Sequence, residues 1–458
     1  MFVGRNEELN LLKEAYNTNK SESICIYGRR RIGKSELIKQ SIKNEKCNII
    51  AFDAKDTSID DNVESLSSIV ERVYQYGKFL SFEKILAFLY EQSSKHKVIL
   101  IIDEFPYLIK QNRGIISVFK NAIDKYKNTN ANLKIIFSGS FIDVMKDLLS
   151  HDSPLYGRFT YRIHLKQLDY LTISKMYSNC SNLDKVLYYS VFGGVPHYAT
   201  FINQNLTFKE NIINIVLQSN AILMDEAEII LGSEINKLSG ANMVLSAISG
   251  KNKHKHAEIF SNTSLNSAPS LSNVLNALIK MELVSKTTPI NDKNNDKKTL
   301  YYIDDNFLIF YYNFLFGKSS FRMITAPSEY YETQIKDKFF NHIVPKAFEE
   351  ICKQFLISQN KLKRIKPPLI EIGTYWYDDH INKVNGQIDI VSRDATGYIG
   401  YECKFNKYSN INIEKITHQI NNYKKLNIPL KDIVFFLFDI NKKEWTINNK
   451  YYTIKDLY

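Results

Sequence analysis

The segment from Gly28 to Ser35 constrains the fold more than any other part of the sequence; it reads G-R-R-R-I-G-K-S. An apolar, β-branched run, Ser23 to Tyr27, leads directly into this segment, and a helical pattern follows it. More such runs alternate with helical patterns further on: Cys47 to Asp53, Val98 to Ile102 and Lys134 to Phe137. Short strands that alternate with helices are typical of a parallel sheet covered by helices. We therefore expect an α/β domain over residues 1–170.

The order of strand, glycine-rich loop and helix is that of a phosphate-binding loop, G-x-x-x-x-G-K-[S/T]. Gly28 and Gly33 allow the backbone to turn its N–H groups toward a β-phosphate. Lys34 is expected to reach the β- and γ-phosphate oxygens, and Ser35 to give a hydroxyl to Mg²⁺. The sequence thus predicts ATP and Mg²⁺ as cofactors. The nucleotide-binding residues expected here are Gly28, Arg29, Arg30, Arg31, Ile32, Gly33, Lys34, Ser35 and Glu36.

A second part of such a site is expected where Asp103 and Glu104 follow the apolar run Val98 to Ile102. Asp103 is predicted to hold Mg²⁺, directly or through water. Glu104 is placed to polarise an attacking water as a general base, the role that separates a hydrolase from a nucleotide binder. The alternative for Glu104 is a solvated acidic neighbour without a catalytic role.

Two further residues are candidates for contact with the γ-phosphate. The run Lys134 to Phe137 ends in Ser138-Gly139-Ser140, where Ser140 could sense the γ-phosphate. The alternative is a plain turn, because serine and glycine favour turns. Arg158, in the loop after Ser153-Pro154, is suited to stabilising a transferring phosphate in cis or from another subunit. A surface arginine is its alternative.

Beyond residue 170 the pattern changes. Thr172 to Leu238 is mostly helical, with a break at Gly193 to Pro196 that cannot lie inside a helix, and we expect a helical lid. Next come helix, turn and helix, with the third helix at Leu271 to Met281, and then strand-like runs at Leu283 to Pro289 and Thr299 to Ile303, which predict a winged helix-turn-helix. The expected domains are a P-loop ATPase core at 1–170, the lid at 171–237, the winged helix at 238–318 and a last α/β domain at 328–458.

Composition limits the class of protein. At 458 residues with 44% hydrophobic side chains, the chain should fold into several domains. Its apolar runs fall far short of the ~18 residues that a membrane span needs, so we expect a soluble, cytoplasmic protein without a membrane partner. Five cysteines without a CxxC pair favour reduced thiols over zinc or disulfides. The formal charge of +11 permits contact with nucleic acid but does not require it.

Together these motifs resemble the prokaryotic AAA-type ATPases of the STAND superclass, whose members join the ATPase to a winged helix and a restriction-endonuclease-like domain. The markers are F-V-G-R at 2–5 with Glu8-Leu9, the loop at 27–35, Asp103-Glu104, Ser138 to Ser140, Ser153 to Arg158, and G-G-V-P at 193–196. The resemblance implies that Arg5 and the break from Gly194 to Pro196 lie against the base and ribose. It also implies that Ser140 is the sensor and Arg158 an arginine finger.

The C-terminal part carries a second group of acidic residues. Gln387 to Val391 and Tyr398 to Lys404 predict a β-hairpin that bears Asp389, Glu402 and Lys404. Glu402 and Lys404 alternate with Cys403 and so share one face of the strand. Asp389 and Glu402 could bind Mg²⁺ or Mn²⁺ while Lys404 acts on water or phosphodiester, as in PD-(D/E)xK nucleases. That resemblance adds Glu349 from an upstream helix at 346–352, and a later helix near 414–426. Gln387 departs from it, since the family commonly shows Glu there.

Two functions follow as hypotheses. The first is a Mg²⁺-dependent ATPase coupled to a nuclease-like domain that acts on or binds DNA, as in defence against foreign DNA. The second is a non-cleaving, nucleotide-switched regulator or scaffold whose C-terminal domain binds DNA or protein. A homo-oligomer or a partner protein suits either hypothesis.

Overall fold

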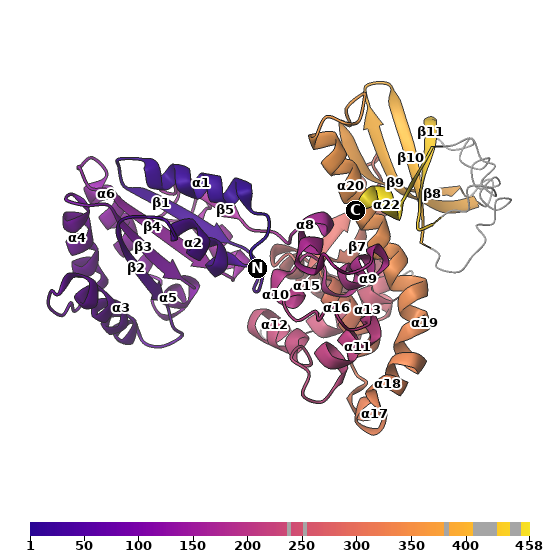
Figure 1. Cartoon of the computed structure of the whole chain (residues 1–458), viewed down its shortest axis with the longest axis horizontal. Helices are drawn as coiled ribbons and strands as arrows, with labels where there is room; N and C mark the ends of the chain where they lie inside the picture. Colours follow the sequence, from indigo (N-terminus) through magenta and orange to yellow (C-terminus); the bar gives the residue numbers. More distant parts are fainter. Residues whose placement is uncertain (236–239, 251–253, 380–383, 406–427, 440–449) are drawn as a thin grey trace. The chain divides into compact units, whose positions relative to one another are not determined.

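The computed structural model describes residues 1–235, 240–250, 254–379, 384–405, 428–439 and 450–458 (Figure 1). The chain divides into two compact units, Met1–Leu168 and Asp169–Tyr458. Each unit has its own apolar core.

The first unit is built on a five-stranded sheet in which every neighbouring pair is parallel. Its strands are β1 Glu22–Tyr27, β2 Asn48–Asp53, β3 Val98–Asp103, β4 Leu133–Gly139 and β5 Tyr161–His164. Their order across the sheet is β2-β3-β4-β1-β5. The structure thus confirms the parallel α/β core that the alternating pattern predicts. Because the neighbouring strands β3, β4 and β1 are parallel, their carboxyl ends lie at one edge of the sheet.

Helices cover both faces of this sheet (Figure 1). They are α1 Asn6–Asn17, α2 Lys34–Ile42, α3 Ile59–Tyr74, α4 Phe82–Ser93, α5 Pro106–Gln111, α6 Ile115–Tyr126 and α7 Ile142–Leu148. Successive residues of a strand point to opposite faces. Leu100 and Ile102 of β3 accordingly pack with α3 to α7, whereas Ile99 and Ile101 pack with α1 and α2. Because helices bury both faces of this sheet, its strands are apolar at nearly every position.

The second unit begins with short helices. They are α8 Tyr170–Ser174, α9 Asn182–Phe192, α10 Pro196–Ala199, α11 Phe208–Ile212 and α12 Glu226–Ile235. The expected break falls between α9 and α10, where Gly193 adopts φ 56° and Pro196 opens α10. Proline suits a first helical position because its missing N–H has no helical partner there.

Three helices and a hairpin follow. They are α13 Ala241–Ser249, α14 His256–Ser261, α15 Ala268–Lys280, β6 Val284–Thr287 and β7 Leu300–Ile303, and the two strands are antiparallel. The helix α15 begins earlier than Leu271, because the Ser267 side chain caps it and a proline, Pro269, lies in its first turn. The hairpin loop packs on the strand β8 of the last sheet: the Ile290 N–H donates to the Thr374 carbonyl at 3.0 Å.

A mostly helical stretch leads to the last sheet. It comprises α16 Asn306–Phe314, α17 Ser319–Ile324, α18 Pro327–Tyr330, α19 Lys336–Lys338 and α20 Val344–Lys361, with π-helical turns at Tyr331–Ile335 and Phe339–Ile343. The sheet contains β8 Glu371–Asp379, β9 Val384–Asp394, β10 Gly397–Lys404, β11 Leu430–Leu437 and β12 Tyr451–Thr453, and α22 Ile454–Leu457 ends the chain.

This second sheet is mixed. Its order is β12-β11-β10-β9-β8; β8 to β10 pair antiparallel, and β10 to β12 pair parallel. The predicted hairpin is confirmed, since Gly397 pairs with Asp394 and Tyr401 with Ile390. The predicted helix near 414–426 lies outside the described residues.

Candidate functional site

The loop from Gly28 to Ser35 joins β1 to α2, and its shape depends on glycine at its first position. Gly28 adopts φ 154°, and a Cβ there would lie 2.2 Å from the Leu165 carbonyl oxygen. Gly33, at φ 93°, precedes α2. The buried Lys34 donates from Nζ to the carbonyl oxygens of Gly28 at 2.9 Å and Arg29 at 3.0 Å. The loop therefore closes around its own lysine, with the N-terminus of α2 beside it.

Ser35 and Asp103 come from distant parts of the sequence and meet at the carboxyl edge of the sheet. The Ser35 hydroxyl donates to Asp103 Oδ2 at 2.6 Å. The other carboxylate oxygen of Asp103 accepts from the Glu104 N–H at 3.1 Å. A hydroxyl beside a carboxylate is a pair of hard oxygen donors, which suits Mg²⁺. The residues that sequence analysis expects to hold this ion thus fit it.

Glu104 lies at the same edge and is held by Ser140, the residue that follows β4. The Ser140 N–H and hydroxyl both donate to Glu104 Oε2, at 3.1 and 2.9 Å. Glu104 has φ 51°, a backbone conformation uncommon outside glycine. Strained residues of this kind persist where the surroundings fix them, often at functional sites. The structure thus brings the candidate base and the candidate sensor into direct contact.

Asp53 is a neighbour that sequence analysis missed. In the register of β2 and β3 it lies opposite Asp103. Burial, and then the negative charges of Asp103 and Glu104, raise the pKa of Asp53. The signal was present in the sequence, because the apolar run Cys47 to Asp53 also ends in a carboxylate.

Arg30 belongs to the loop, and two aromatic side chains hold it. Its Nη2 donates to the Tyr107 hydroxyl at 3.3 Å, and its guanidinium carbon lies 5.4 Å from the centre of the Phe141 ring. Tyr107 and Phe141 meet edge to face, with ring centres 5.7 Å apart. Neither aromatic residue was a candidate from sequence.

Arg5 makes structural contacts within the first unit. Its guanidinium pairs with Glu8 at 3.2 Å and donates to the carbonyl oxygens of Ile32 at 3.3 Å and Lys166 at 2.5 Å. It therefore ties the N-terminal segment, the phosphate loop and the segment after β5 together.

Arg158 is held on α6. It pairs with Asp124 through Nε at 2.8 Å and Nη2 at 2.9 Å. The hydrogen bonds from Arg158 contribute most to lowering the pKa of the Asp124 carboxyl to about 2. Arg158 thus has an intramolecular carboxylate partner.

Gly194 and Pro196 lie in the second unit, at the turn between α9 and α10. The other nucleotide-site candidates, from Arg5 to Arg158, all belong to the first unit.

The candidate metal ligands of the second unit lie on α20, β9 and β10. Asp389 Oδ2 accepts from the Cys403 N–H at 2.9 Å. Lys404 pairs with Glu402 at 2.6 Å, and Lys346 with both carboxylate oxygens of Glu349 at 2.9 and 3.0 Å. The Glu402 side chain is only 2% exposed, whereas that of Lys404 is 33% exposed, so the pair reaches the surface through its lysine.

The neighbouring carboxylates affect the pKa of Glu349. Burial first, and then the charge of Asp389, raise the pKa of Glu349 to about 7, and Glu402 adds to this, while Lys346 opposes it. The described part of the chain nevertheless contains no group of three or more His, Cys, Asp or Glu side chains arranged to hold a metal ion. Lysines engage two of the three predicted ligands, Glu349 and Glu402.

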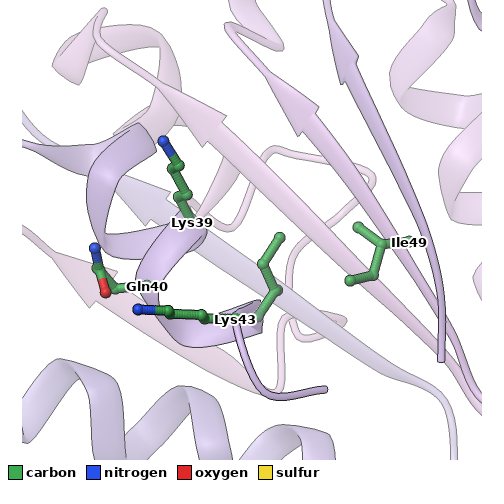
Figure 2. Close-up of a pocket in the computed structure, with 5 residues that line it drawn as sticks. Lys39, Gln40, Lys43 and Ile49 are labelled. Atoms are coloured by element: carbon green, nitrogen blue, oxygen red, sulfur yellow. The ribbon is translucent and has the colours of Figure 1, made fainter. Parts of the chain in front are cut away.

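The first unit also has a surface hollow of about 420 Å³ (Figure 2). It is lined by Lys39, Gln40, Ile42, Lys43 and Ile49. The first three belong to the C-terminal part of α2, Lys43 directly follows that helix, and Ile49 lies on β2, whereas Lys34 and Ser35 open α2. No helix in the described ranges is long and apolar enough to cross a membrane.

Family comparisons identify two parts of the chain. Residues 2–200 match the model of a family described as an ATPase domain predominantly from Archaea. Residues 311–416 match a family described as archaeal and bacterial proteins of unknown function. The chain thus carries an ATPase domain, followed by a region of the second family.

Individual relatives extend this similarity. An uncharacterized protein of Methanocaldococcus jannaschii is 29% identical over 447 residues, 97% of this chain and 96% of the relative. An uncharacterized ATP-binding protein of the same organism is 52% identical over 46 residues, 10% of this chain and 78% of the relative. A solved Walker-type ATPase of Pyrococcus abyssi covers 68% of this chain and 96% of its own, with a TM-score of 0.53 and 19% identity. At this identity the last likeness concerns the fold alone.

Proposed function

We propose that this protein hydrolyses ATP with Mg²⁺ at the carboxyl edge of the first sheet. The observation that carries the proposal is the 2.6 Å hydrogen bond from Ser35 to Asp103. It joins the end of the phosphate loop to the end of β3, as a Mg²⁺–nucleotide site requires. The family match over residues 2–200 supports an ATPase.

The residues divide the work as follows. Lys34 exchanges its carbonyl partners for the β- and γ-phosphate oxygens, and the N–H groups of the loop surround the β-phosphate. Ser35 and Asp103 would hold Mg²⁺, and the bound ion would supply positive charge next to the phosphate oxygens. Glu104 takes a proton from the attacking water, and Ser140 fixes the Glu104 carboxylate.

For the base and ribose we propose Arg5, from the side of the first unit. The contact of Arg5 with the Ile32 carbonyl supports its part, because it fixes the loop from the side of the N-terminal segment. We propose that Arg29 and Arg31, in the loop, and Glu36, in the first turn of α2, also contact the nucleotide.

Removal of the Ser35 hydroxyl tests the proposal. We expect Ser35→Ala to lower the rate of phosphate release by ~10² and to raise the Mg²⁺ concentration that gives half-maximal turnover. The matched control is Ser68→Ala on α3, whose exposed hydroxyl donates to the Glu64 carbonyl of the same helix. An unchanged Mg²⁺ dependence in Ser35→Ala would place the ion elsewhere.

For the second unit we propose a PD-(D/E)xK-like site that acts on DNA with Mg²⁺ or Mn²⁺, next to a winged helix formed by α13 to α15 and the β6–β7 hairpin. The observation that favours it is that Asp389 and Glu402 lie on the paired strands β9 and β10, where the Asp389 carboxylate accepts from the Cys403 N–H at 2.9 Å and Lys404 pairs with Glu402. Their carboxylate oxygens are suitable ligands, and Lys404 is suited to act on water or phosphate. Defence against foreign DNA and assembly into an oligomer fit this proposal.

A non-cleaving regulator is the rival, and one observation favours it. Lys346 and Lys404 already neutralise Glu349 and Glu402, so the carboxylates are satisfied without a metal ion. In that case the unit would bind DNA or protein without cutting it.

A cleavage assay separates the two. Linear, circular and single-stranded DNA would be incubated with Mg²⁺ or Mn²⁺, with and without ATP. We expect metal-dependent cleavage by the wild type, its loss in Asp389→Asn and its retention in the control Asp432→Asn, an exposed position on β11. DNA retention without cleavage in all three proteins would support the regulator.

A further inference from the structure

The guanidinium of Arg30 contacts two side chains that carry no negative charge, so these contacts do not neutralise it. Arg30 Nη2 donates to the Tyr107 hydroxyl oxygen at 3.3 Å, and the ring centre of Phe141 lies 5.4 Å from the guanidinium carbon. Both partners are neutral, and an aromatic face attracts a cation. Arg30, Tyr107 and Phe141 are each partly exposed, so the group lies at the surface of the site.

The two aromatic residues belong to the segments that carry the candidate base and sensor. Phe141 directly follows Ser140, and the Tyr107 N–H donates to the Glu104 carbonyl at 3.0 Å. The Ser140 hydroxyl in turn bonds the Glu104 carboxylate at 2.9 Å. Arg30 is therefore connected through two short paths to the residues proposed to handle the attacking water.

Other cations of the first unit have different partners. Arg158 makes a bidentate pair with Asp124, and Arg5 pairs with Glu8. In the proposed mechanism Lys34 binds the β- and γ-phosphate oxygens. Withdrawing Arg158 toward a phosphate would cost its pair with Asp124, whereas Arg30 would keep its neutral contacts.

We propose that Arg30 supplies, in cis, the cation that stabilises the transferring γ-phosphoryl group. The proposal rests on ATP hydrolysis at this site. The water oxygen bonds to the γ-phosphorus as the bond from that phosphorus to the β–γ bridging oxygen breaks, and this electron pair stays on ADP. The water proton passes to Glu104 and then to solvent. Arg30 neutralises the charge that spreads over the γ-phosphoryl oxygens in between.

Tyr107 and Phe141 are positioning residues in this scheme. The tyrosine hydroxyl fixes the direction of the guanidinium, and the phenylalanine ring supports its face. A planar guanidinium stacks on a ring and donates in a fixed fork, which an ammonium group cannot reproduce. Arg30→Lys should therefore restore little of the function.

The first experiment compares Arg30→Ala and Arg30→Lys with the wild type and with Arg113→Ala, an exposed arginine between α5 and α6. Turnover, ADP affinity and affinity for the transition-state mimic ADP–aluminium fluoride are measured. We expect both Arg30 variants to lose ~10³ in kcat and to lose mimic affinity, while ADP affinity changes less than twofold. Arg113→Ala should match the wild type.

The second experiment tests positioning. We expect Tyr107→Phe, which keeps the ring and removes the hydroxyl, to lower kcat about tenfold with little change in KM for ATP. In the Arg30→Ala background the same change should have no further effect, because the hydroxyl acts through Arg30. Phe141→Leu should behave likewise. Equal effects of Tyr107→Phe in both backgrounds would show a structural role and overturn the positioning assignment.

The outcomes separate this inference from the proposed function. Wild-type kcat in Arg30→Ala, or equal losses of ADP and mimic affinity, would overturn the role of Arg30 while ATP hydrolysis stands. The proposed function itself would be overturned if the wild type showed no turnover and Lys34→Ala bound ATP as tightly as the wild type does. If wild-type turnover instead rises with the square of the protein concentration, and if Arg158→Ala abolishes turnover, the cation would come from a second copy of this chain.

Discussion

Glu104 has an acceptor oxygen already fixed by its neighbours. Ser140 donates to Oε2 from both its N–H and its hydroxyl, so the carboxylate cannot rotate without losing two hydrogen bonds. A base that is held in place acts on a positioned water more effectively than a mobile one, because less reorganisation accompanies the reaction. The strained φ of Glu104 is one cost of this arrangement.

A prediction at this scale concerns Glu104→Gln. Glutamine keeps an acceptor oxygen for Ser140 but cannot take a proton at neutral pH. We expect ATP affinity to persist within about threefold and turnover to fall by ~10² or more. Isothermal titration and phosphate release measure the two quantities. Glu91→Gln, an exposed change near the end of α4, is the control, and wild-type turnover in Glu104→Gln would mean that another group orients the water.

The sequence predicts individual residues unequally. Lys34, Ser35 and Asp103 follow from spacing, because the phosphate loop and the end of an apolar strand are local patterns. Tyr107 and Phe141 could not be found this way, because nothing local marks an aromatic residue as the partner of an arginine many positions away. Their role depends on the order of the strands, which brings the ends of β3 and β4 next to the loop after β1.

At the scale of elements, β1 to β4 of the first sheet and the β9–β10 hairpin could be predicted, whereas β5 Tyr161–His164 was missed. Each is a short apolar run bounded by turn residues. The strand order could not, since the runs do not state their neighbours. The docking of the hairpin loop was also missed. Its polar sequence at 291–296 indicates a solvated loop, yet Ile290 beside it is only 5% exposed and packs among Tyr375, Ile388 and Val391.

This loop joins the β6–β7 hairpin to the last sheet, and a prediction follows. Lys293 and Glu371 form an ion pair beside the Ile290 contact, and Glu371 also pairs with Arg393. Surface pairs of this kind contribute little, so the buried isoleucine should dominate. We expect Ile290→Ala to lower the free energy of unfolding of the second unit by about 2–4 kcal/mol.

Denaturant unfolding of the full chain measures this change, and limited proteolysis shows whether the loop has become accessible. Asn294→Asp, an exposed position in the same loop, is the control and should change the stability by less than about 0.5 kcal/mol. Equal protease resistance of Ile290→Ala and wild type would mean that the loop is held by other contacts.

At the scale of the whole molecule, the chain carries two groups of chemically active residues in two units with separate cores. The apolar clusters around the first sheet contain residues of the first unit alone, and the cluster on β9 and β11 contains residues of the second. Units that do not share a core respond independently to substitutions that spare their folding. A change at one group should therefore leave the chemistry of the other intact.

The final prediction uses Asp389→Ala and Lys404→Ala in the full chain. We expect ATP turnover in both to stay within twofold of the wild type, because neither residue belongs to the first unit. Metal-dependent cleavage should vanish in Asp389→Ala, which loses a ligand. It should only slow in Lys404→Ala, because lysine acts on water or phosphate and its loss leaves the carboxylates in place. Phosphate release and gel-based cleavage are measured on the same preparations. Cleavage that survives Asp389→Ala would contradict the metal assignment, and a parallel loss of ATP turnover in a variant that unfolds at the wild-type temperature would show that the two units are coupled.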